Sequence, residues 1–122
     1  MSRRYNRAMQ IIKARLANSD LQTIAFHTFG NLVKAVVDIR RKVVAIDAPL
    51  HADLEQFLLE RGSIQSDLWG INLHPDQYGT DNFIEYDSMI NLRPNQNNFT
   101  RSVDNPKIQN QISQIVKPIF TN

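Results

Sequence analysis

The sequence predicts an α+β fold with about five mostly antiparallel strands and three helices, in the order β-α-β-β-α-β-β-α. Two stretches, 33–47 and 68–93, alternate apolar and polar residues with the period of a strand, and each is long enough to form a hairpin. Three others, 19–30, 51–61 and 106–119, repeat apolar residues at helical spacing. We expect the helices to pack on one face of the sheet and to leave the other face polar.

Length and charge distribution indicate one domain with a basic arm. A chain of 122 residues has the size of one domain, which we assign to residues 9–122. Five of its 14 basic residues precede the first acidic residue, Asp20, so the rest of the chain carries nine basic and 12 acidic residues, 9 − 12 = −3. We expect residues 1–8 to form a flexible extension that can contact nucleic acid or an acidic partner.

Composition excludes several classes of site. The chain has no cysteine, which excludes disulfides, thiolate metal sites and cysteine catalysis. No apolar run approaches the ~20 residues of a membrane helix, and no signal-type apolar stretch follows the basic N-terminus. We therefore expect a soluble, cytoplasmic protein with no membrane partner.

The first two elements are a segment with two interpretations and a helix. In residues 9–16, apolar residues at helical spacing slightly favour a helix over a poorly alternating strand. Ser19 and Gln22 have the spacing of a capping box, in which each side chain bonds the backbone N–H of the other, and this predicts a helix start at Ser19. Gly30 can adopt the left-handed conformation that ends the helix.

Residues 33–61 predict a hairpin followed by a helix. The two strands have an apolar face, while Lys34, Asp38 and Asp47 belong to the other face. Arg40 and Arg41 do not readily adopt positive φ, so we expect a loop longer than two residues between the strands. The helix after Pro49 ends at Gly62. His51 and Glu55 lie one turn apart on it, and we interpret them as an exposed pair rather than a metal or acid–base pair.

Residues 68–93 predict a central hairpin with one polar face. In its first strand, Trp69 alternates with Asn72 and His74, and we expect Trp69 to be a core residue. In its second strand, the outward-facing residues should be Glu85, Asp87, Met89, Asn91 and Arg93. An asparagine-rich loop follows, and the pair Asn105-Pro106 marks the start of the third helix.

This polar face is the candidate site. Two carboxylates two residues apart on a strand, Glu85 and Asp87, suit a divalent cation, with His74 as a further ligand or a base. Arginine and loop amides suit a phosphate or carboxylate. The alternative is a solvated sheet surface, although asparagine is rare in strands. The candidate ligand-binding residues are Asn72, His74, Glu85, Asp87, Asn91, Arg93, Gln96, Asn98, Arg101 and His51.

Two stretches carry a resemblance to a known family. The segments Asp-Leu-Trp-Gly-Ile-Asn-Leu from Asp67 and Glu-Tyr-Asp-Ser-Met-Ile-Asn-Leu-Arg-Pro from Glu85 resemble a family of small bacterial proteins known only as a domain of unknown function. The resemblance covers residues 9–117 and implies that residues 9–16 form a strand. Family members carry Ser-Gln-Gly-Asn-Arg-Ser-Arg-Gly where this chain has Asn95 to Ser102, so Gln96, Asn98 and Arg101 match this pattern. The resemblance implies no activity.

Three functions follow as hypotheses. The first is a binding or regulatory module that takes a polar small molecule or a protein partner on the polar face. The second is a phosphoesterase or nuclease-like enzyme with a divalent cation held by Glu85, Asp87 and His74. The third is a nucleic-acid binder acting through the basic arm. The sequence contains no phosphate-binding glycine loop, no zinc-protease motif and no nucleophile elbow, so no established motif favours the enzyme.

Overall fold

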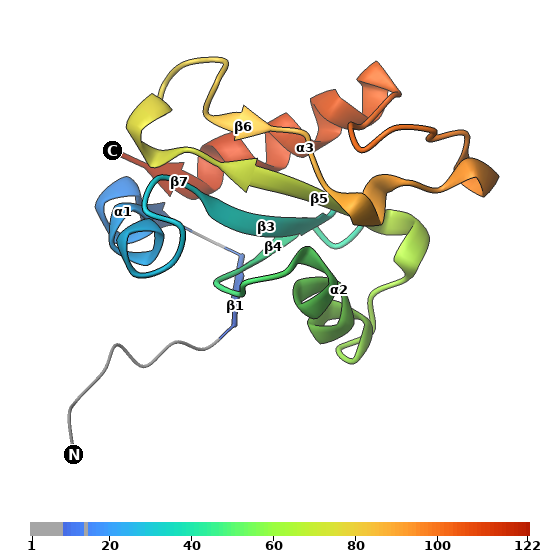
Figure 1. Cartoon of the computed structure of the whole chain (residues 1–122), viewed down its shortest axis with the longest axis horizontal. Helices are drawn as coiled ribbons and strands as arrows, with labels where there is room; N and C mark the ends of the chain where they lie inside the picture. The colour runs from blue at the N-terminus through green and yellow to red at the C-terminus, as the bar shows by residue number, and fades with distance from the viewer. Residues whose placement is uncertain (1–8, 14) are drawn as a thin grey trace.

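The computed structural model describes residues 9–13 and 15–122, and within them it shows an α+β fold (Figure 1). The main sheet is antiparallel, with strands in the order β1 (Gln10–Ile12), β4 (Val43–Ile46), β3 (Val33–Asp38), β5 (Leu68–Leu73) and β6 (Ile84–Glu85). Two further strands, β2 (Leu16–Ala17) and β7 (Phe120–Thr121), form a short parallel pair. The helices are α1 (Asn18–His27), α2 (His51–Leu59) and α3 (Pro106–Ile119). None of the helices described here has the length and hydropathy to cross a membrane.

The first described segment is extended, as the family resemblance implies and against the helical periodicity. Gln10 to Ile12 pair with Ile46 to Val44 and so complete the outer edge of β4. Tertiary pairing therefore overrides the weak helical pattern. The expected extension over residues 1–8 lies outside the described residues.

The predicted capping box at the start of α1 is wrong. The N-cap residue is Ala17, and no side chain of the described residues caps the helix. Ser19 lies inside the helix, where its carbonyl accepts a hydrogen bond from Thr23 Oγ1. Because Ala17 also pairs with β7, the end of β2 decides where α1 begins. Gly30 follows the helix with φ +89, as predicted, and its N–H donates to the Ala25 carbonyl at 2.7 Å.

The predicted hairpin over residues 33–47 is confirmed, including its longer connection. Asp38 pairs with Val43, and the chain turns between them with Lys42 at φ +58. The Asp38 carboxylate accepts hydrogen bonds from the N–H groups of Arg40 and Arg41 at 3.0 and 2.9 Å. It also accepts one from the Ser63 hydroxyl at 2.6 Å. The carboxylate is fully buried, and these hydrogen bonds organise the turn.

The expectation that all helices pack on one face of the sheet is wrong. α1 and α3 cover the face that carries Trp69 and Ile71, whereas α2 places Leu54 and Leu58 on the opposite face. All four residues of β4 are buried, because its two pleat faces meet different helices. A run of four consecutive apolar residues is the pattern of a strand covered on both sides.

The predicted strand over residues 84–93 is also wrong, because β6 ends at Glu85. The chain then turns out of the sheet, and Ser88 Oγ accepts from the Ile90 N–H at the start of a 3₁₀ turn over Met89–Asn91. The side chain of Asn91 pairs with the edge of β5 instead. Its Oδ1 accepts from the Gly70 N–H at 2.8 Å, and its Nδ2 donates to the Gly70 carbonyl at 2.9 Å. One amide thus replaces the backbone of a partner strand.

Candidate functional site

A groove of about 520 Å³ lies on the face of the sheet that α2 partly covers. Its floor is a row of three polar residues from adjacent strands: Lys34 of β3 pairs with Asn72 of β5, which pairs with Glu85 of β6. Leu50 and the first residues of α2 form one wall. The other side is lined by the segment that follows β6, with Asp87, Met89 and, from the next loop, Arg101.

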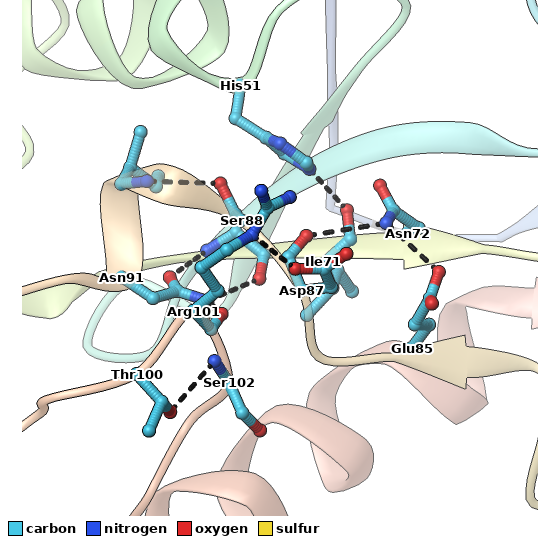
Figure 2. A network of polar contacts seen from close by, with 12 residues as sticks. His51, Ile71, Asn72, Glu85, Asp87, Ser88, Asn91, Thr100, Arg101 and Ser102 are labelled. Carbon is cyan, nitrogen blue, oxygen red and sulfur yellow. Dashed lines mark hydrogen bonds and ion pairs between the residues drawn. The ribbon is translucent and has the colours of Figure 1, made fainter.

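Asn72 is the buried centre of this floor. Its side chain is almost fully covered, with the residue 6% exposed. Nδ2 donates to Glu85 Oε1 at 3.1 Å and to the Asp87 carbonyl at 3.3 Å, and Figure 2 shows the amide turned toward both. Oδ1 has no donor among the described residues. Buried side-chain oxygens normally accept a hydrogen bond, so this residue has acceptor capacity that the fold does not use.

His51 reaches the groove from the first turn of α2. Its Nε2 lies 2.7 Å from the Ile71 carbonyl, as Figure 2 shows, and the residue is buried. The predicted exposed pair with Glu55 is therefore wrong, because the histidine turns inward onto β5. Burial lowers the pKa of His51, and the Lys34 charge lowers it further, while the contact with Ile71 and the Asp87 charge oppose the shift.

One ion pair and one histidine–carboxylate contact border the groove. Arg101 Nε donates to Asp87 Oδ1 at 2.7 Å, and Figure 2 shows the two side chains meeting beside Asn72. His74 Nε2 lies 3.0 Å from Glu85 Oε1. The Asp87 and Glu85 side chains are 40% and 48% exposed, so these pairs are open to solvent and to a ligand.

The structure brings half of the candidate residues to the groove and half elsewhere. Those that line it are His51, Asn72, Glu85, Asp87 and Arg101. His74 contacts the groove only through Glu85. Asn91, Arg93, Gln96 and Asn98 direct their polar groups to the chain itself: Asn91 bonds Gly70, and Gln96 Nε2 donates to the Ser66 carbonyl at 3.1 Å.

Arg93 and Asn98 hold the segment 91–104 in place. Arg93 donates to the carbonyls of Gln65 and Leu68, and its guanidinium lies 4.3 Å from the centre of the Trp69 ring. Burial lowers the pKa of Arg93, and Glu55 opposes this shift. Asn98 Nδ2 donates to the Asn91 carbonyl at 2.8 Å, while its Oδ1 accepts from the Asp104 N–H at 2.7 Å. An amide suits an irregular loop because it donates and accepts at once.

The carboxylates and the histidine do not converge as a metal site requires. In the part of the chain that the structure describes, no three His, Asp or Glu side chains are placed to share an ion. Glu85 and His74 meet each other, whereas Asp87 is turned to Arg101. The groove offers separate charged and amide groups.

The comparisons with known proteins identify a family. A family model described as "Protein of unknown function (DUF5674)" matches residues 10–119, which include the whole main sheet and all three described helices. The chain belongs to this family. The result confirms the resemblance to a domain of unknown function carried by the segments from Asp67 and Glu85. No curated protein and no solved structure matches this DUF5674 member.

Sequence reasoning missed several groove residues of this family member. Lys34 was predicted on the polar face but not assigned to the site, because its place depends on the register that sets it beside Asn72. Three exposed apolar side chains at the border were also missed: Phe29, Leu50 and Met89 are 46%, 55% and 62% exposed. Phe29 and Leu50 lie just outside α1 and α2, and Met89 was predicted on the outward face but not assigned to the site.

His51 should make the stability of this family member depend on pH. Because its pKa in the folded protein is lowered from 6.5, the unfolded chain takes up a proton on this residue at a higher pH than the folded protein does. Its contribution to stability is therefore full above pH 6.5 and is lost as the pH falls from there through the folded pKa. We expect the melting temperature of wild type to fall more steeply in this window than that of His51→Gln. Parallel curves would contradict this assignment.

Proposed function

We propose that this DUF5674 member is a binding module that takes a small polar ligand in the groove between α2, the sheet and the segment after β6. The observation that carries the proposal is the convergence of Lys34, Asn72 and Glu85 in one row beneath an open groove. These residues come from three strands, and none of them is needed to fill a core. Concave sites with a few convergent polar groups are the usual form of small-molecule sites.

Two further features support binding over a merely solvated surface. The buried side chain of Asn72 leaves its Oδ1 without a hydrogen-bond donor among the described residues. The border adds Leu50 and Met89, which expose apolar atoms beside the charged groups. A face that only meets water has no need of this mixture.

A thermal-shift screen tests the proposal. Wild type is titrated with amino acids, organic acids, sugars, nucleotides, inorganic phosphate and divalent cations, because a ligand that binds only the folded state raises the melting temperature. We expect at least one class to raise it in a concentration-dependent way. Glu85→Gln should reduce this shift. Glu60→Gln, which changes an exposed acid just after α2 and outside the groove, should not. No shift with any class, or equal shifts in both variants, would contradict the proposal.

A further inference from the structure

The charges around the groove are balanced and separated. Lys34 and Arg101 are the cations, and Glu85 and Asp87 are the anions. His51 adds no positive charge at neutral pH, because burial lowers its pKa. Arg101 and Asp87 form an ion pair at 2.7 Å. The two remaining charges, Lys34 and Glu85, lie at opposite ends of the floor. A purely anionic or purely cationic ligand would meet repulsion from one end.

Lys34 is the cation at one end of the floor. Its ammonium lies 5.1 Å from the centre of the Phe29 ring, and it forms no ion pair with any carboxylate of the described residues. The side chain is only partly buried, so its charge is available to a ligand. The N-terminus of α2, at Leu50 and His51, also lines the groove, and the helix dipole there favours an anion.

Glu85 and Asn72 supply acceptors at the other end. Glu85 is about half exposed, and its Oε1 already gathers Asn72 Nδ2 and His74 Nε2, so an ammonium can bind its second oxygen. Asn72 holds Glu85 Oε1 in place through Nδ2, and its own Oδ1 is covered and has no donor among the described residues. Lys34 and Glu85 are two strand spacings apart, about 10 Å between backbones, and their side chains can close on a ligand lying between them.

We infer that the ligand is a zwitterion, namely a free α-amino acid with an apolar side chain. Its carboxylate binds Lys34 and the start of α2, and its ammonium binds Glu85, whose other oxygen Asn72 holds. The exposed apolar atoms of Phe29, Leu50 and Met89 accept its side chain. This inference rests on the proposed function and names the substrate class of the same groove.

Calorimetric titration with three matched ligands tests the inference on the full chain. Leucine carries both charged groups, isocaproate lacks the ammonium, and isoamylamine lacks the carboxylate. We expect leucine to bind and each analogue to bind at least about tenfold more weakly, since each loses a charge-assisted contact. Dipeptides of leucine distinguish a site for a free amino acid from a site for a peptide terminus. A dipeptide that binds as tightly as leucine would overturn the assignment to a free amino acid.

Variants connect each ligand group to its residue. Glu85→Gln should weaken leucine but leave isocaproate unchanged, and Lys34→Gln should weaken leucine but leave isoamylamine unchanged. Lys117→Gln and Glu60→Gln remove exposed charges outside the groove and serve as matched controls. Isocaproate binding as tightly as leucine would overturn the zwitterion. If leucine does not bind, but a ligand of another class from the thermal screen binds wild type and not Glu85→Gln, this inference alone is overturned. If no class of ligand binds, the proposed function is overturned as well.

Discussion

Replacing Asn91 with alanine should lower the free energy of unfolding by about 3 kcal/mol, as expected for several buried groups that lose their partners together. The Asn91 amide bonds both the N–H and the carbonyl of Gly70, and its Nδ2 also donates to the Arg101 carbonyl at 3.0 Å. The residue is completely buried, so water cannot take over these bonds without opening the edge of β5. Urea denaturation monitored by circular dichroism measures the change.

The matched control is Asn95→Ala, which removes the same side chain from an exposed position four residues later. It should change the free energy of unfolding by less than about 0.5 kcal/mol. Asn91→Asp should be at least as harmful as alanine, because a carboxylate facing the Gly70 and Arg101 carbonyls repels them. A small effect of both Asn91 variants would show that the side chain does not replace a strand.

Gly70→Ala should also be strongly destabilising, by about 3 kcal/mol or more, because the added carbon has no space. A Cβ at this position would lie 2.5 Å from both Cβ and Oγ of Ser88 and 3.1 Å from the Ile90 side chain. The 3₁₀ turn that carries Ser88 is tied to Arg101 by a backbone hydrogen bond of 3.0 Å, so it cannot simply move away. The midpoint of urea denaturation measures this loss.

A second substitution tests the cause of this loss. Ser88→Gly removes both atoms that the new Cβ would meet most closely, so the double variant should be more stable than the sum of the two single changes predicts. We expect an interaction energy of at least about 1 kcal/mol. Additive effects would mean that Gly70 is required for a reason other than close contact with Ser88. Gly79→Ala is not an equivalent control, since Gly79 has space around it but a positive φ of +85.

Local patterns explain which elements could be predicted. The hairpin over residues 33–47 follows from alternation, and α3 begins at Asn105-Pro106 because the asparagine side chain accepts from the Lys107 N–H at 2.9 Å. Gly30 and Gly62 end their helices with φ +89 and +98. Each of these features is determined by residues that are close in the sequence.

The remainder depends on contacts that a local pattern cannot show. Asn91 and Gly70 are 21 residues apart, and alternation alone placed Asn91 on a solvent-facing strand. Leu54 and Leu58 have the spacing of any amphipathic helix, and only the strands they cover decide which side of the sheet α2 occupies.

The candidate site likewise has a part that local patterns predict and a part that they do not. The polar residues were found from their spacing, but the groove exists because α2 and the 3₁₀ turn lie on either side of the row that contains Asn72.

The most direct test of the account is to locate ligand binding in the folded protein by amide NMR. Spectra of the nitrogen-labelled chain are recorded with and without the ligand class that gives the largest thermal shift. The perturbed resonances should cluster at Lys34, the start of α2 and Ser88 to Ile90, and the side-chain amide resonance of Asn72 should shift with them. Perturbations confined to other surfaces, or an Asn72 amide that does not respond while binding occurs, would contradict the claim that this groove is the ligand site.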